Sequence, residues 1–131
     1  MKAFHIINFI AIALILVFIC IAEELTVSSS LREVQNRCFN IERIIEKEGT
    51  LKIGRIVLAV DNLEYVWGEA ESNLCYMVNH KNVQEIGQEI IKAKQYISED
   101  NIEEFKVSID LIKFYCHSYL HFMGANMHNI L

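Results

Sequence analysis

Residues 101–123, NIEEFKVSIDLIKFYCHSYLHFM, carry apolar side chains at alternating steps of three and four positions. This spacing is typical of an α-helix with one apolar face, because 3.6 residues complete one turn. Asn101 followed by Glu104 predicts a helix start, since the Asn side chain accepts hydrogen bonds from first-turn N–H groups. The expected apolar face consists of Ile102, Phe105, Ile109, Ile112, Cys116, Tyr119 and Met123.

The segment before this one repeats the pattern. Asn82 with Glu85 gives the same start signal. The polar stretch SEDN, residues 98–101, is long enough to reverse the chain between two antiparallel helices and too short to be a linker. The predicted helix presents Val83, Ile86, Ile90, Ala93 and Ile97 on one face.

Two further helices are predicted upstream. One begins near Thr50 and ends between Ser72 and His80, with apolar positions Ile53, Ile56, Val60, Leu63, Trp67, Ala70, Leu74 and Met77. The other begins at the serines of residues 28–30 and ends at Gly49, which can adopt the left-handed conformation that terminates a helix. Its apolar positions are Leu31, Val34, Cys38, Ile41 and Ile45.

The composition supports a fold made of helices alone. Proline is absent and only five glycines occur, so few residues favour the tight turns of a small β-rich domain. We therefore expect an all-α fold, in which an N-terminal transmembrane helix is followed by an antiparallel bundle of about four amphipathic helices, arranged as two helical hairpins. The expected core contains Leu31, Val34, Ile41, Ile45, Ile56, Val60, Leu63, Trp67, Ile86, Ile90, Ile97, Phe105, Ile109 and Ile112.

Residues 3–22, AFHIINFIAIALILVFICIA, contain no charged side chain. As a helix they would extend ~30 Å, which is the thickness of the hydrocarbon layer of a bilayer. This favours an uncleaved signal anchor in residues 1–22 and a second domain in residues 23–131. A signal peptide cleaved after Ala22, with Cys20 two positions earlier, is the alternative, and it would give a secreted protein.

The flanking charges predict the orientation of this anchor. Lys2 precedes the apolar segment and Glu23 and Glu24 follow it, which favours a cytoplasmic N-terminus and an extracytoplasmic domain in the cell membrane. The predicted partners are the membrane, through residues 3–22, and an unidentified protein. Residues 23–131 carry a net charge of −6, which disfavours nucleic acid as a partner.

A family resemblance covers most of this domain. Its pattern is the tryptophan of LEYVWGEA, then YMVNHKNVQEIGQEIIKAKQYISEDNIEEFKVSIDLIKF, in which His80 opens an Ile-rich helix that Tyr96 and Ile97 close. In this order the chain resembles an uncharacterised family, a domain of unknown function, of small single-span proteins from spore-forming low-GC Gram-positive bacteria. The resemblance implies a helical domain held at the membrane, with no assigned activity.

Cysteine and histidine offer the candidate metal ligands Cys75, His80, Cys116, His117 and His121. Two histidines four positions apart share one face of a helix, and thiolates with imidazoles suit zinc. However, the spacing of Cys75 and His80 matches no chelating pair, and Cys116 and His117 point in directions ~100° apart on a helix. We expect no metal and no other cofactor.

Three cysteines in residues 23–131 are an odd number for an oxidised disulfide framework. Buried free thiols at Cys38, Cys75 and Cys116 are favoured, and one intramolecular disulfide or a bridge to another chain remain the alternatives.

The sequence carries no catalytic motif that we recognise, so a non-catalytic role is expected. The first hypothesis is an accessory or scaffolding subunit that binds another membrane or envelope protein. Five aromatic residues beside the core positions, Tyr65, Tyr76, Tyr96, Phe114 and Tyr115, are candidates to contact a partner. The alternative is a secreted carrier that holds a small apolar ligand in a cavity lined by Trp67, Phe105 and Phe122.

Overall fold

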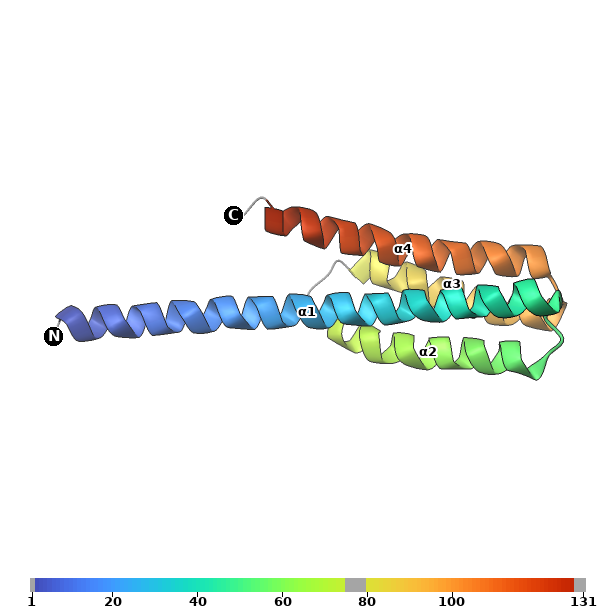
Figure 1. Ribbon diagram of the computed structural model, residues 1–131, viewed down its shortest axis with the longest axis horizontal. Coiled ribbons are helices and arrows are strands. Elements are labelled where there is room, and N and C mark those ends of the chain that lie inside the picture. The colour runs from blue at the N-terminus through green and yellow to red at the C-terminus, as the bar shows by residue number, and fades with distance from the viewer. Residues whose placement is uncertain (1, 75–79, 129–131) are drawn as a thin grey trace.

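The computed structural model describes the backbone of residues 2–74 and 80–128 and the side chains of residues 4–74 and 83–122. Its four helices are α1 (Lys2–Glu48), α2 (Gly54–Leu74), α3 (His80–Glu99) and α4 (Ile102–His128), and no strand occurs in the described ranges. The all-α prediction is confirmed. Figure 1 shows the helices side by side, with the N-terminal half of α1 extending beyond the other three.

The first helix corrects one prediction. The apolar segment and the first bundle helix form one uninterrupted helix, α1, so the described residues form four helices and not a separate anchor followed by four more. No helix begins at Ser28, Ser29 or Ser30. Residues 2–48 contain neither glycine nor proline, and each serine costs only ~0.5 kcal/mol relative to alanine. Extending an existing helix also avoids the unfavourable nucleation of a new one.

The helices pack in a closed ring in which α1 contacts α2 and α4, and α3 contacts α2 and α4. Each helix turns its apolar positions toward the middle of this ring, where they form one cluster. Of the expected core positions, Ile97 is half-buried and the other thirteen are buried. Val27, Leu51, Val83, Ala93 and Cys38 are also buried in this cluster.

The two connections at the far end of the bundle are defined by backbone geometry. Gly49 ends α1 with φ of 66°, as predicted, and its N–H donates to Ile45 O at 2.8 Å. Asp100 ends α3 in the same left-handed region, at φ of 55°, and its N–H donates to Ile97 O. Asn101 then starts α4 as predicted, with its side-chain oxygen accepting the Glu104 N–H at 3.3 Å.

Two helix starts differ from prediction. Helix α2 begins at Gly54 and not near Thr50, because Thr50 Oγ1 accepts the Lys52 N–H in a local turn that competes with the helix. The same turn buries Leu51 against the core. Helix α3 begins at His80, two residues before Asn82. Met77, Cys75 and Tyr76 lie outside the described residues, and the side chains of His80, Asn82 and Met123 are likewise not described.

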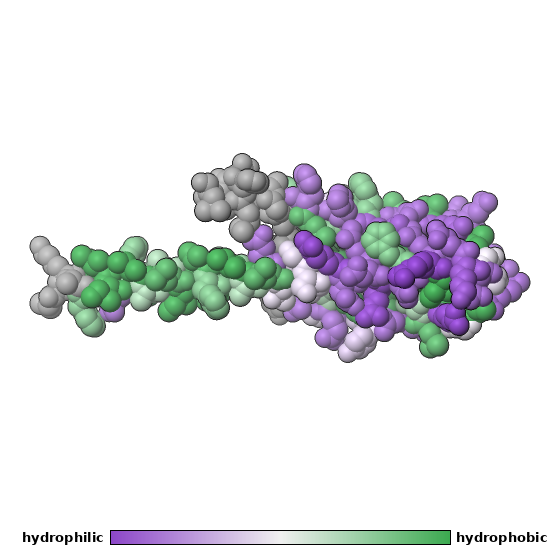
Figure 2. Space-filling model, viewed as in Figure 1, coloured by the Kyte–Doolittle hydropathy of each residue, from purple (hydrophilic) through white to green (hydrophobic). Residues whose placement is uncertain are grey.

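The apolar part of α1 and the C-terminal end of α4 lie at the same end of the molecule, opposite the α1–α2 and α3–α4 connections (Figure 1). Within the described residues, α1 is the helix long and apolar enough to cross a membrane, and none of its apolar window is buried. Figure 2 shows this part as a hydrophobic rod leading into a bundle with a largely hydrophilic surface.

Candidate functional site

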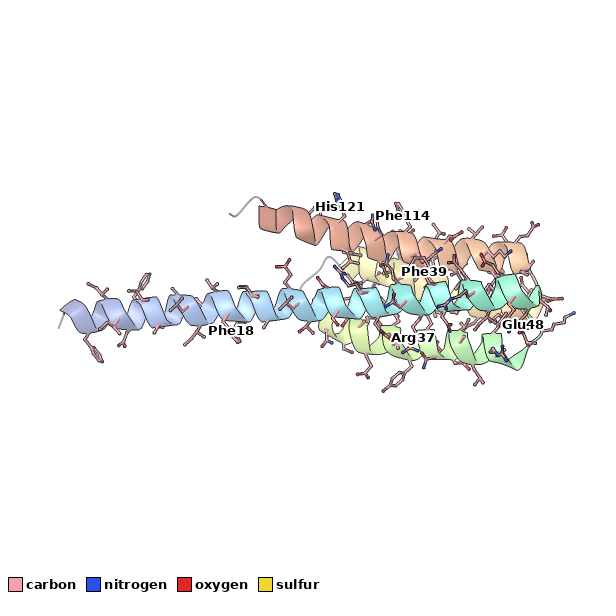
Figure 3. All side chains as sticks on the ribbon, viewed as in Figure 1. Phe18, Arg37, Phe39, Glu48, Phe114 and His121 are labelled. Carbon is pink, nitrogen blue, oxygen red and sulfur yellow. The ribbon has the colours of Figure 1, made fainter. Side chains whose placement is uncertain are left out.

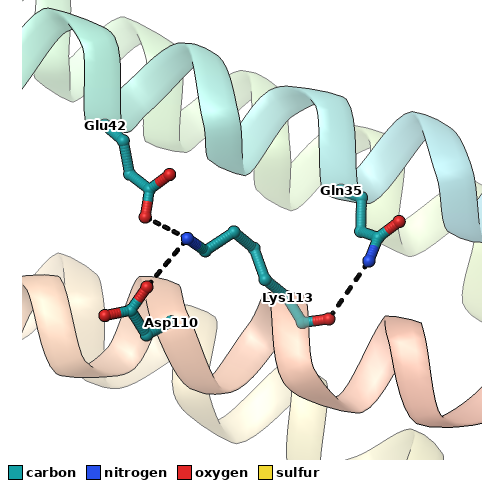
Figure 4. Close-up of polar contacts among 4 residues, drawn as sticks. All are labelled: Gln35, Glu42, Asp110 and Lys113. Carbon is teal, nitrogen blue, oxygen red and sulfur yellow. Dashed lines mark hydrogen bonds and ion pairs between the residues drawn. The ribbon is translucent and has the colours of Figure 1, made fainter.

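The side of the bundle formed by α1 and α4 carries its most connected set of polar side chains. The Lys113 ammonium pairs with Asp110 Oδ1 at 2.8 Å, one turn earlier on α4, and with Glu42 Oε1 on α1. Gln35 Nε2, also on α1, donates to the Lys113 backbone carbonyl at 3.3 Å. We call Gln35, Glu42, Asp110 and Lys113 the polar cluster (Figure 4). Its contacts link α1 to α4.

The polar cluster shifts two pKa values. Partial burial lowers the pKa of Lys113, but its hydrogen bonds to Asp110 and Glu42 outweigh that effect, so the pKa ends above the usual lysine value. The hydrogen bond from Lys113 lowers the pKa of Asp110, and burial only partly opposes this. Both shifts favour the charged forms. The cluster is therefore a stable ion network near neutral pH and not a poised acid or base.

Aromatic rings adjoin the polar cluster. The Lys113 ammonium lies 5.1 Å from the centroid of the Phe39 ring, which is a favourable cation–π distance. Phe114 meets Tyr115 edge to face, with 5.9 Å between centroids. Phe39 is 50% exposed and Phe114 is 61% exposed, so the two helices present apolar area to solvent on either side of a charged group. Figure 3 labels Phe39 on α1 and Phe114 and His121 on α4.

The helical repeat explains how these side chains reach the surface. Lys113 and Phe114 follow the core residue Ile112, and steps of ~100° per residue carry Lys113 to the α1 side and Phe114 to the outside of the bundle. Among the aromatic residues predicted to lie beside the core, Phe114 and Tyr65 are exposed, whereas Tyr96 and Tyr115 are half-buried.

A second feature lies between α2 and α3. An open groove of about 540 Å³ there is lined by Trp67, Gly87 and Ile91, among others. The Trp67 indole N–H is buried and has no hydrogen-bond partner among the described residues. An alanine Cβ at position 87 would come within 3.2 Å of Trp67 Nε1, so Gly87 is the residue that lets the indole approach α3. At Trp67 and Gly87, therefore, α2 and α3 approach each other closely.

A second groove, of about 450 Å³, lies between α1 and α2 and includes Arg37, Arg55 and Leu58 in its lining. The ligand cavity expected from Trp67, Phe105 and Phe122 is not formed by these residues. Trp67 and Phe105 are buried in the core, whereas Phe122 is 67% exposed on the outside of α4. The two described grooves are open to solvent and do not enclose a ligand.

The structure does not bring the described candidate metal ligands together. Cys116 is buried in the core, whereas His117 and His121 are exposed on the surface of α4. The side chains of Cys75 and His80 are outside the described set. Over the part of the chain that the structure describes, no group of three or more His, Cys, Asp or Glu side chains is close enough to hold a metal ion.

The core cysteines Cys38 and Cys116 are free thiols, from α1 and α4 respectively. Burial raises the pKa of Cys116 to about 12, and a backbone hydrogen bond opposes only part of that shift. Burial also raises the pKa of Cys38 strongly, helped by its neighbour Cys116. Because the thiolate is the reactive form, both groups are poor nucleophiles and poor metal ligands at neutral pH.

Comparison with known proteins gives one match. A family model described as a domain of unknown function (DUF4363) matches residues 26–130. This match covers the whole bundle and excludes the apolar segment of residues 3–22. No curated protein and no solved structure matches the chain.

Proposed function

We propose a function from the premise that this chain belongs to the DUF4363 family, a domain of unknown function. The chain is a membrane-anchored protein whose helical domain is extracytoplasmic and acts by binding and not by catalysis. It serves as an accessory or scaffolding subunit for another membrane or envelope protein. Residues 3–22 are the anchor, and residues 23–131 are the binding domain.

The observation that carries this proposal is the continuity of α1. One helix contains both the uncharged segment and the buried core residues that begin at Val27. Only four residues separate Ala22 from Val27, which is ~6 Å of helix. A bundle attached in this way is held close to the bilayer, with the α1–α2 and α3–α4 connections directed away from it.

Attachment to the membrane suits a protein that binds another membrane protein better than it suits a secreted carrier. Confinement to the membrane surface raises the effective concentration of the domain for another membrane protein, so weak contacts become sufficient. The charge distribution supports the orientation, since Lys2 lies before the apolar segment and Glu23 and Glu24 lie after it. The exposed rings of Phe39 and Phe114 supply apolar area of the kind found at protein interfaces.

Three measurements on the producing cells test this proposal. Alkaline carbonate extraction should leave the chain in the membrane pellet, and intact mass should show an N-terminus that has not been cut after Ala22. A Glu46→Cys variant, whose new thiol lies on an exposed position of α1, should react with a membrane-impermeant maleimide in intact cells. The unmodified chain is the control for background thiols.

Different results would select a different function. A chain that begins at Glu23 and accumulates in the medium would support the secreted carrier. Labelling of the Glu46→Cys variant only after the cells are lysed would reverse the orientation. Substrate turnover by the purified chain would contradict the non-catalytic role.

A further inference from the structure

Helix α4 has a second apolar face that points away from the bundle. Val107 is 52% exposed, Phe114 is 61% exposed and Phe122 is 67% exposed, while Leu111 is partly exposed. We call Val107, Leu111, Phe114 and Phe122 the outer stripe. Its members are separated by four, three and eight positions, so they follow one side of the helix over four turns.

The outer stripe is nearly opposite the core. Val107 precedes the core residue Ile109 by two positions, and Phe114 precedes Cys116 by two positions. Two positions correspond to ~200° around a helix, so stripe and core lie on opposite sides. The outside of α3, by contrast, carries the exposed polar residues Gln88, Lys92, Gln95 and Glu99, with a single exposed large apolar residue among its described side chains, Ile91. Apart from Ser118, which lies one turn after Phe114, the stripe is an exposed or partly exposed apolar surface, and such surfaces mark interaction sites.

The height of the stripe excludes lipid as its occupant. The Lys113 carbonyl contacts Gln35, which lies thirteen residues after Ala22 on α1. At 1.5 Å per residue, Phe114 therefore lies ~20 Å beyond the end of the apolar segment, and Val107 lies ~10 Å farther away. The headgroup layer extends only ~5–8 Å beyond the hydrocarbon. Only the Phe122 end of the stripe comes near the membrane surface.

The charges beside the stripe distinguish between two occupants, a second copy of this chain and a different membrane protein. Glu103 and Glu104 are exposed at the start of α4, on either side of the stripe, and neither forms an ion pair with another described residue. Two copies anchored in one membrane would point the same way, so these carboxylates would face their own counterparts at the same height. A partner with Lys or Arg at that height would instead gain complementary charge.

We infer that the outer stripe docks an amphipathic helix of a second, different membrane protein. Basic residues of that helix lie beside the carboxylates of Glu103 and Glu104. The partner helix lies along α4 and continues toward the bilayer next to residues 3–22. This inference rests on the proposed function, because the shared membrane sets the common direction of the helices. It adds to that function the surface and the chemical class of the partner.

Photocrosslinking in the membranes of the producing cells tests the inference. Benzoylphenylalanine replaces Phe114 in the full chain, and the matched control carries it at Gln88, an exposed position on α3. Carbonate extraction of the same samples is done first, so that loss of anchoring is recognised separately. We expect an adduct from position 114 and none from position 88.

Mass spectrometry of the adduct decides the result. The inference requires that the attached peptide come from an amphipathic, Lys- or Arg-containing helix adjoining a membrane span of another protein. Replacing Glu103 and Glu104 with lysine should lower the adduct yield about fivefold, whereas the same change at Glu69 and Glu71 on α2 should not. An adduct of twice the chain mass, equal adducts at 114 and 88, or no adduct from a membrane-inserted chain would each overturn it.

Discussion

Trp67 on α2 and Gly87 on α3 are in direct contact, because a Cβ added to Gly87 would lie 3.2 Å from the indole nitrogen. The indole is buried, and a Cβ at this distance would require it to shift by a few tenths of an ångström. Gly68, one residue after Trp67, has nothing within 4 Å of the corresponding position. The two glycines therefore occupy helix interiors for different reasons.

This contact predicts that alanine at Gly68 and alanine at Gly87 have opposite effects on the free energy of unfolding. Gly68→Ala should raise the free energy of unfolding by ~0.5–1 kcal/mol, because alanine favours the helix. Gly87→Ala gains the same propensity but overpacks the α2–α3 contact, which costs ~1–3 kcal/mol, so it should lower stability by ~1 kcal/mol. Chemical denaturation of the full chain in detergent measures both. Equal gains in the two variants would show that α2 and α3 separate easily.

The polar cluster predicts a dependence of stability on pH. Because the pKa of Asp110 is lowered in the folded chain, its ionised form stabilises the fold above its usual value of 3.8, and this contribution is lost as pH falls below it. Because the pKa of Lys113 is raised, its contribution is present below the usual value of 10.5 and is lost as pH rises through the folded pKa. Both contributions are complete between about pH 5 and 9.

Asp110→Asn isolates the acid side of this window. The variant should be less stable than the unmodified chain at pH 7, by less than ~1 kcal/mol because the Asp110 side chain is 66% exposed. The difference should be smaller at pH 3, because the contribution of the ionised carboxyl is lost as pH falls below its usual pKa of 3.8. Urea unfolding at the two pH values measures it. A difference that is the same at both would show that Asp110 contributes through packing and not through charge.

Asp100 predicts a stabilising substitution. It holds a left-handed conformation at φ of 55°, which costs a residue with a Cβ about 1 kcal/mol relative to glycine. Asp100→Gly should therefore raise stability by up to ~1 kcal/mol, even though it removes the exposed ion pair with Lys52. Asp100→Ala is the control, because it removes the same pair and keeps the strain. If both variants lose stability equally, the ion pair matters more than the backbone.

The buried thiols predict a labelling pattern. In a chain with Cys20→Ser and Cys75→Ser, Cys38 and Cys116 are the remaining cysteines. Both are fully buried with raised pKa values, so neither should react with iodoacetamide at pH 7.5 in the native state. Both should react in denaturant, as two added groups in the intact mass. A denatured chain that reacts only after reduction would establish the disulfide alternative.

Local sequence signals predicted much of this fold. The steps of three and four residues identify core positions such as Ile109 and Val60 because burial follows the helical repeat directly. Gly49 and Asn101 were recognisable because end-capping depends on residues within one turn. The serines at 28–30 misled because serine, although favoured at helix starts, costs little inside a helix, and the unbroken helix on both sides outweighs that cost.

Contacts between distant segments could not be predicted in the same way. Glu42 and Lys113 are 71 residues apart, and nothing near either residue indicates the other. The approach of Trp67 to Gly87 depends on how far α2 and α3 rotate against each other, which the helical repeat does not define. The pattern placed Phe114 away from the core, but only the ring arrangement of the helices shows that its side of α4 is the outside.

With residues 3–22 as the proposed anchor, the unbroken helix that joins anchor and bundle would also act as a lever. Helix α1 continues for 26 residues beyond Ala22, so its far end would stand ~39 Å beyond the hydrocarbon layer. A tilt of ~20°, typical of membrane helices, would swing that end sideways by ~13 Å. Lipid thickness, which sets the tilt, would thus determine how far across the membrane surface the tip of this protein can reach.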